Sequence, residues 1–191
     1  MGTIKDFKYK VIKNFLNKEE VDLLSIYCQI KHRINTRNFE LGTGITSAPD
    51  TSFYGEAIFD SLLIGKTNVV ENESGLFLNP TYSFWRLYTK YSSLARHKDR
   101  PSCEISLTIN LGSDGTPWPI FVEDKPIFAE PGDAIMYSGC ELFHHREEYK
   151  GTWHAQVFLH YVKKDGLYKD NYMDKRNYWS LPSTHWHLKE N

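Results

Sequence analysis

The sequence predicts a mainly β domain of the sandwich, jelly-roll or barrel type, with an amino-terminal helix packed on one sheet. Three observations predict this fold class: short runs of β-branched and aromatic residues after position 80, turn signals between them, and one amphipathic helical pattern before them. The 191 residues suit a single domain over 1–191. We expect its core at about 80–162, a variable lid at about 36–80, and a carboxy-terminal arm at 163–191.

The composition excludes several classes of protein. Hydrophobic residues make up 40% and aromatic residues 15% of the chain, enough for a packed core rather than disorder. A net charge of -1 argues against nucleic acid or an anionic membrane as the main partner. There is no apolar run of membrane-spanning length, and the charged start does not resemble a signal peptide. Three scattered cysteines are expected to be buried thiols of a cytoplasmic protein.

The first 35 residues read as a strand and a helix. Phe7, Tyr9 and Val11 alternate with lysines, which is the period of a half-exposed strand. Asn17 precedes Glu20 by three residues, as in a capping box, and this predicts a helix over 18–32. One face of that helix is apolar, so we expect it to lie on a sheet.

The remaining elements follow in order. Glycine-rich sequence over 36–80 predicts long connections with one short helix at 57–64, of the kind that often form lids over a substrate. The carboxy-terminal segment from position 163 is charged and aromatic, and we expect it to pack as an arm across the domain. Strands are predicted at 83–88, 104–111, 119–122, 127–128, 134–137 and 154–162.

Two of these strands have an unusual polar face. Ser106 and Thr108 alternate with aliphatic residues in one, and in the last strand the polar face carries His154, Gln156, Phe158 and His160. The ordinary interpretation is that the apolar face points into the core and the polar face into solvent. The alternative is a polar pocket enclosed between the two sheets of a jelly roll.

A candidate metal site lies in the same half of the chain. His97 and Asp99 stand two residues apart, and the pair His144–His145 follows about 47 residues later. Two imidazoles and one carboxylate form the facial triad that holds non-haem Fe(II) and leaves coordination positions open. A surface ion pair and an unrelated loop histidine would give the same spacing, and the residues alone leave both interpretations open.

The combined pattern resembles the Fe(II)/2-oxoglutarate-dependent oxygenases, most closely the prolyl 4-hydroxylase-like branch. The resemblance lies in His97-x-Asp99, the remote His144, the segment Arg86-Leu87-Tyr88, the segment 131–137 and the strand-to-helix start at 11–20. It implies a double-stranded β-helix, Fe(2+), and 2-oxoglutarate as cosubstrate. It also implies an O₂-dependent hydroxylase that oxidises a C–H bond of a small molecule or peptidyl side chain and releases succinate and CO₂.

The resemblance also implies roles for individual residues. His97, Asp99 and His144 would be the iron ligands, with His145 as the fallback, and Tyr88 would lie near the cosubstrate. The family expects a basic residue about ten positions beyond the distal histidine, and this chain has none there. Arg146 is our preferred anchor for the far carboxylate of 2-oxoglutarate, although it could equally be an exposed partner of a neighbouring glutamate. Further candidate contacts are Arg86, His154 and Gln156, with Ser106 or Thr108 assisting.

Two other functions stay open at this stage. A cupin-like metal enzyme that does not use 2-oxoglutarate would explain the missing basic residue on the last strand. A non-catalytic jelly-roll binding module would make the histidines incidental. The smaller expectations are that Cys103 and Cys140 are buried packing residues and that His160 is a hydrogen-bonded core histidine.

Overall fold

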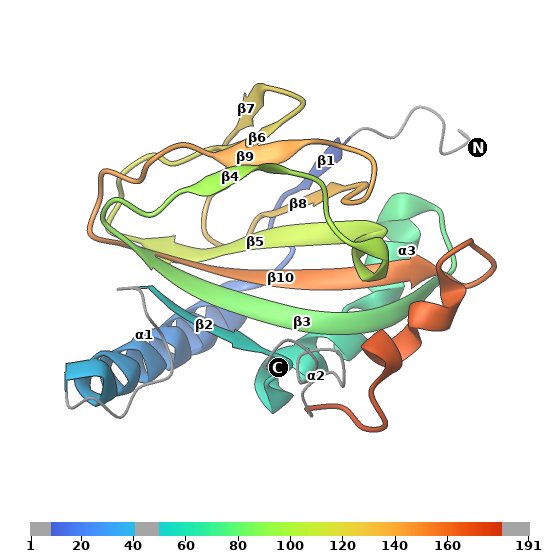
Figure 1. Ribbon diagram of the computed structural model, residues 1–191, viewed down its shortest axis with the longest axis horizontal. Helices are drawn as coiled ribbons and strands as arrows, with labels where there is room; N and C mark the ends of the chain where they lie inside the picture. Colours follow the sequence, from blue (N-terminus) through green and yellow to red (C-terminus); the bar gives the residue numbers. More distant parts are fainter. Residues whose placement is uncertain (1–8, 41–49, 181–191) are drawn as a thin grey trace, which may run out of the picture.

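The computed structural model describes the backbone of residues 9–40 and 50–180, which form two antiparallel sheets facing each other (Figure 1). The larger sheet has the strand order β1-β8-β5-β10-β3-β2, and the smaller has the order β4-β9-β6-β7. The predicted jelly-roll class is confirmed. The strands are β1 (Tyr9–Ile12), β2 (Thr51–Tyr54), β3 (Leu78–Thr89), β4 (Leu94–His97), β5 (Ile105–Ser113), β6 (Ile120–Val122), β7 (Lys125–Ile127), β8 (Ala134–Tyr137), β9 (His144–Arg146) and β10 (Trp153–Lys163).

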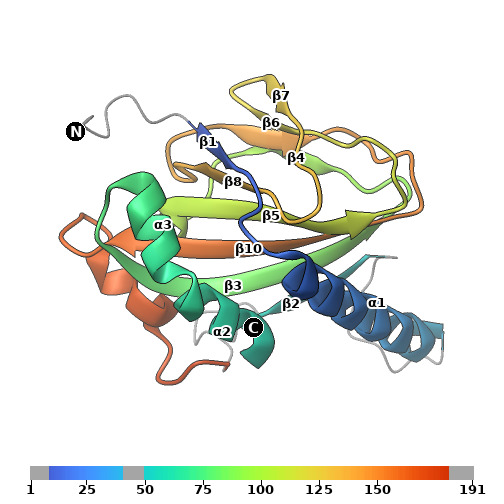
Figure 2. The ribbon, with the colours of Figure 1, turned by 180° about the vertical axis from the view of Figure 1, so that it is seen from behind.

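Three helices cover the outer face of the larger sheet (Figure 2). They are α1 (Lys18–Glu40), α2 (Ala57–Gly65) and α3 (Thr67–Ser74). The predicted capping box is confirmed, because the Asn17 side chain accepts a hydrogen bond from the Glu20 amide at 2.8 Å and the Glu20 carboxylate accepts one from the Asn17 amide at 2.9 Å. The helix runs to Glu40 instead of ending near position 32. In the described part of the chain, no helix is both long enough and apolar enough to cross a membrane.

Both faces of the larger sheet are buried. This corrects the ordinary interpretation of the alternating pattern, in which the polar face points into solvent. Ile105, Leu107 and Ile109 point into the main hydrophobic core on the helix side. Ser106 and Thr108, between them in sequence, are equally buried. Their polar face meets the smaller sheet and not solvent, as the alternative of a pocket between the sheets predicted.

The segment from 50 to 80 contains more regular structure than its composition suggested. In addition to the predicted short helix, it forms β2 at the edge of the larger sheet and a second helix, α3. β4 and β9 were also missing from the prediction, because they are only four and three residues long and carry histidines and arginines in place of apolar residues. Their backbones pair with each other, so tertiary contacts decide their conformation.

The carboxy-terminal arm packs against β3, as expected, through a 3₁₀ segment at Lys169–Lys175. The Arg176 guanidinium is buried there and forms an ion pair of 2.8 Å with Asp60 of α2. Asp174 of the same segment accepts hydrogen bonds from Arg100, in the loop after β4, at 2.6 and 2.7 Å. The arm thereby holds the loop that follows β4. Phe7 of the predicted first strand lies outside the described residues, as does the end of the arm from position 181.

Candidate metal centre

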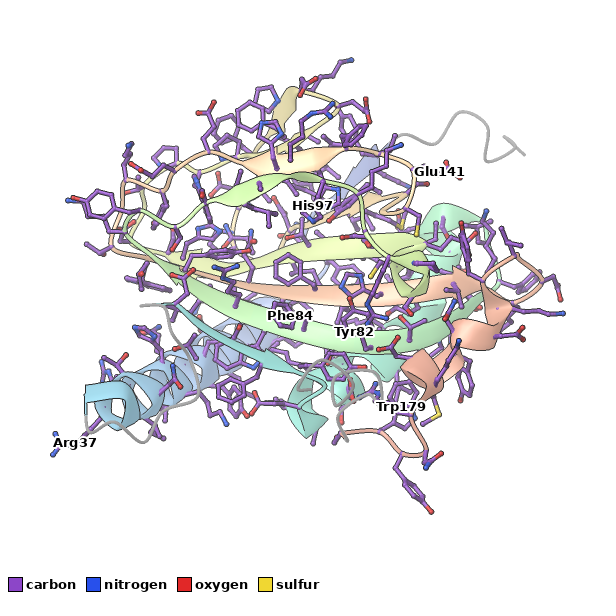
Figure 3. The ribbon with its side chains drawn as sticks, in the orientation of Figure 1. Arg37, Tyr82, Phe84, His97, Glu141 and Trp179 are labelled. Carbon is purple, nitrogen blue, oxygen red and sulfur yellow. The ribbon has the colours of Figure 1, made fainter. Side chains whose placement is uncertain are left out.

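Three predicted ligands meet on one side of the smaller sheet. β4 ends at His97 and β9 begins at His144, and the antiparallel register places these two residues directly opposite each other. The backbone N–H of Asp99 donates to the Gly139 carbonyl at 2.9 Å, which turns the Asp99 side chain toward both histidines. His97 lies on the side of β4 that faces the larger sheet (Figure 3).

The hydrogen bonds of the two imidazoles leave one nitrogen of each ring available. Nδ1 of His97 donates to the Ala95 carbonyl at 2.7 Å, and Nδ1 of His144 donates to the Leu142 carbonyl at 3.1 Å. A carbonyl only accepts, so the proton of a neutral ring is on Nδ1 and the lone pair is on Nε2. Both Nε2 atoms face Oδ1 of Asp99, at 3.5 Å from His97 and 3.4 Å from His144.

These distances suit three ligands around a cation better than they suit hydrogen bonds. Ligands at about 2.1 Å from a metal and at right angles to each other are about 3 Å apart. The three ligand atoms all lie within 4.8 Å of one another. With both imidazoles neutral and Asp99 ionised, the set carries one negative charge and offers the oxygen and nitrogen ligands that Fe(II) accepts.

The environment keeps Asp99 ionised and oriented. Burial opposes its ionisation, but the neighbouring imidazoles of His144 and His97 outweigh burial and hold the pKa of Asp99 well below its usual range. The Ser106 hydroxyl donates to Oδ2 of Asp99 at 3.0 Å and also lies 3.0 Å from Nδ1 of His160. Burial lowers the pKa of His160 to about 4, so this ring is neutral at neutral pH. One carboxylate oxygen is thus fixed by Ser106, while the other faces the histidines.

The candidate metal centre opens into a pocket of about 180 Å³ between the two sheets. His160 is a hydrogen-bonded core histidine as predicted, and in addition it lines this pocket. Figure 3 shows Tyr82 and Phe84 between the sheets on β3. The residues that line the pocket are Tyr82, Phe84, Arg86, Tyr88, Leu94, His97, Asp99, Ile120, Tyr137, His144, Arg146, Phe158 and His160.

Arg146 is the unusual charge of this pocket. Its residue is only 4% exposed, and it forms no ion pair with a carboxylate of the described residues. The guanidinium donates to the Trp118 carbonyl and lies 4.6 Å above the Trp118 ring. Burial lowers the pKa of Arg146 to about 10, so it stays protonated at neutral pH. The alternative of an exposed partner for Glu147 or Glu148 is wrong, because Arg146 points inward.

Arg86 lines the same pocket but is already paired. Its guanidinium binds the buried Asp50 carboxylate through Nε at 3.0 Å and through Nη2, and it lies 4.5 Å above the Tyr88 ring. Asp50 also accepts hydrogen bonds from the Thr89 amide and hydroxyl. Because the charge of Arg86 is neutralised within the fold, Arg146 is the stronger attraction for an anion.

The other predicted contacts are buried nearby with unused hydrogen-bonding capacity. Within the described part of the chain, Thr108 Oγ1, Gln156 Oε1 and both ring nitrogens of His154 have no hydrogen-bond partner. His154 packs against Trp118 and lines a separate groove of about 800 Å³ beside α1. Burial and the neighbouring Arg146 lower its pKa to about 3. A second cation at position 154 would therefore repel Arg146.

The site also contains residues that the sequence analysis did not name. Tyr137 lines the pocket, and its position at the end of the segment 131–137 was the available signal. Trp118 supports Arg146, a role that no local pattern indicates. The fallback ligand His145 stacks on Phe121 at 4.7 Å on the other side of β9. Cys103 is buried as expected, whereas Cys140 is half-exposed.

No family model and no curated protein matches this sequence. Solved structures do match its fold. A viral collagen prolyl hydroxylase from Paramecium Bursaria Chlorella virus-1, in complex with 2-oxoglutarate, aligns with a TM-score of 0.62 and 14% identity over 85% of this chain and 100% of that one. A Pseudomonas putida prolyl-4-hydroxylase aligns with a TM-score of 0.59 and 17% identity over 81% of this chain and 92% of that one. HygX from Streptomyces hygroscopicus, with nickel and 2-oxoglutarate bound, aligns with a TM-score of 0.61 and 11% identity over 82% of this chain and 83% of that one. The chain shares the double-stranded β-helix fold of these proteins.

Proposed function

We propose that this protein is an Fe(II)- and 2-oxoglutarate-dependent oxygenase of the hydroxylase type. The observation that carries the proposal is one pocket that contains both a two-histidine, one-carboxylate cluster and a buried arginine that has no carboxylate partner among the described residues. The first feature suits a ferrous ion, and the second suits a dianionic cosubstrate. The fold shared with proteins solved with 2-oxoglutarate supports the same function.

In this proposal His97, Asp99 and His144 hold the metal through two Nε2 atoms and one carboxylate oxygen. The backbone carbonyls of Ala95 and Leu142 orient the two rings, and Ser106 orients the carboxylate. When bound, Fe(II) would activate O₂, and 2-oxoglutarate would supply two of the four electrons that O₂ accepts while a C–H bond is hydroxylated, with succinate and CO₂ as the co-products.

Arg146 is proposed to bind the far carboxylate of 2-oxoglutarate. It stands two residues after His144 on the same face of β9, so the two side chains are roughly 7 Å apart along the strand, close to the length of a five-carbon dicarboxylate. An unpaired buried guanidinium is costly, and a carboxylate that accepts two hydrogen bonds from it removes that cost. Tyr88 lines the pocket beside it, and Thr108 and Gln156 offer further polar atoms.

The two alternatives explain fewer of these features. A cupin-like metal enzyme without 2-oxoglutarate would leave the buried charge of Arg146 unexplained. A binding module would give no role to the two Nε2 atoms that face one carboxylate oxygen. It would give none to the inward-pointing arginine either. We propose a small molecule or a peptidyl side chain as the substrate, with Phe84 and Phe158 as the apolar wall of the pocket. The three free thiols suit the cytoplasm.

The test is succinate formation by protein loaded anaerobically with Fe(II), given 2-oxoglutarate and then air. We expect slow succinate release without added substrate, and its loss in His97→Ala and Asp99→Ala. His145→Ala is the matched control, since this neighbouring ring points away from the cluster, and it should keep the activity. Fe(II) binding without 2-oxoglutarate binding would favour the cupin-like enzyme. Absence of both would leave the binding module.

A further inference from the structure

A stripe of apolar side chains faces solvent along α1. Its members recur at intervals of three and four residues, so they share one side of the helix. The buried side of the helix is different, and carries Val21, Leu24 and Cys28. The α1 stripe consists of Leu23, Ile26, Ile30 and Ile34, which are 62%, 55%, 52% and 53% exposed.

The α1 stripe continues into an apolar groove. At the Leu23 end, a depression of about 450 Å³ lies between α1 and the helices α2 and α3. Ile58, Leu62 and Val69 line it together with Leu23. Four large aliphatic side chains in a row, joined to a groove, form a contiguous apolar patch, and such patches on proteins usually mark an interaction site.

Unpaired charges of opposite sign stand at the two ends of the same helix face. Glu19 is exposed at the amino-terminal end, and Arg33 and Arg37 are exposed at the carboxy-terminal end. None of the three forms an ion pair with another described residue, whereas Lys18, Lys31 and Glu20 of the same helix do. Figure 3 shows Arg37 at the far end of α1, pointing away from the rest of the molecule.

We propose that the α1 stripe is a homodimer interface in which α1 packs antiparallel to α1 of a second copy. The two-fold axis lies on the solvent side of α1, level with position 28 along the helix. It places Ile26 against Ile30 of the partner and Leu23 near Ile34 of the partner. The same axis brings Glu19 of each copy against Arg37 of the other copy, so the dimer contains two such pairs. A parallel arrangement would place like charges against each other at both ends, so the charges select the antiparallel one.

The occupant is a second copy because the surface is complementary to itself. One register aligns the apolar centre and both charged ends: the residue numbers of the facing pairs Ile26–Ile30 and Glu19–Arg37 each add to 56. Leu23 and Ile34, whose numbers add to 57, are offset by one residue. A helix pair alone buries less than the roughly 1,600 Å² of a standard interface, so we expect a dimer of micromolar rather than nanomolar affinity. The interface lies on the outside of the helix layer, away from the candidate metal centre (Figure 2), and does not depend on the proposed function.

The test is the molecular mass in solution by sedimentation across a concentration series up to about 200 µM, a range chosen for a micromolar dimer. We expect a monomer–dimer equilibrium for the wild type and a monomer for the Ile26→Ser/Ile30→Ser double variant. Both side chains are exposed, so the variant should fold, and unchanged circular dichroism and melting temperature would show this. Phe77→Ser is the matched control: Phe77 is 74% exposed but lies outside the α1 stripe, and its replacement should leave the equilibrium unchanged.

A charge exchange tests the orientation. Arg37→Glu should weaken the dimer roughly tenfold, because the new carboxylate faces Glu19 of the partner, and this repulsion occurs at both ends of the helix pair. Adding Glu19→Arg to the same chain restores opposite charges only in the antiparallel pair, and should restore the wild-type affinity. A wild type that remains monomeric throughout the series would overturn the proposal. So would a dimer that persists in Ile26→Ser/Ile30→Ser, or an Arg37→Glu dimer that Glu19→Arg fails to rescue.

Discussion

The two faces of the larger sheet contrast within the same strands. The outer face of β5 and β10 is aliphatic, fully buried and packed under the helices. The inner face is just as buried, but it carries Ser106, Thr108, His154 and Gln156, and several of their polar atoms have no hydrogen-bond partner in the part of the chain that the structure describes. Burial alone therefore does not distinguish a core from a site. Buried polar atoms without hydrogen-bond partners do distinguish the two, because such atoms lower stability and are expected at a binding site rather than in a core.

Neighbouring residues of β5 allow the sharpest test of this contrast. Leu107→Ala, on the outer face, should lower the free energy of unfolding by about 2–5 kcal/mol because it leaves a cavity in the main core. Thr108→Val, on the inner face, should leave stability unchanged or raise it, because it removes a buried hydroxyl without a partner. Urea unfolding of both variants measures the difference. Equal losses would show that the two faces serve stability alike.

Arg146→Met should separate binding from stability on the inner face. Loss of the guanidinium is expected to weaken 2-oxoglutarate binding about 100-fold, equivalent to about 2.7 kcal/mol. The unfolding free energy should stay constant or rise, because a buried charge without a carboxylate partner is replaced by an apolar side chain. Calorimetric titration of the metal-loaded protein measures the affinity. A large stability loss with unchanged affinity would assign Arg146 to the framework.

Acid should weaken the fold through the inner face. Burial lowers the pKa of His154 from 6.5 to about 3, so the unfolded chain binds a proton that the folded chain excludes. The stability linked to this ring is fully present above its unfolded pKa and is lost as pH falls below 6.5. At about pH 5 the loss is about 2 kcal/mol for this residue. Thermal melts should show a smaller loss between neutral pH and about pH 5 in His154→Leu; an identical loss would contradict the assignment.

The smallest expected effect is on the helix layer of the outer face. Asn17→Ala removes the acceptor that caps the first turn of α1 and should destabilise the protein by about 1 kcal/mol. Because α1 packs on the side away from the candidate metal centre, succinate formation per folded molecule should not change. Denaturant unfolding and the succinate assay together check this, and a change in turnover without a change in stability would link α1 to the site.

Local pattern and spacing were sufficient to predict several features of this protein. The strand periodicity, the turn residues and the capping box predicted the jelly roll and the first helix, because these signals arise from neighbouring side chains and backbone geometry. The candidates His97, Asp99, His144 and Arg146 came from the residue types and from the resemblance to a known family. In the structure all four line one pocket.

The direction in which those residues point depends on contacts between distant segments of the chain. β4 and β9 are too short and too polar to be predicted, and they form because their backbones pair with each other in the smaller sheet. That pairing turns His144 inward and His145 outward, a choice that adjacent histidines leave open in the sequence. The different environments of the two arginines are also decided by tertiary contacts. Asp50, 36 residues before Arg86, neutralises Arg86, while Arg146 donates to the Trp118 carbonyl and meets no carboxylate of the described residues. Local pattern cannot encode such contacts, because each depends on where a distant segment lies.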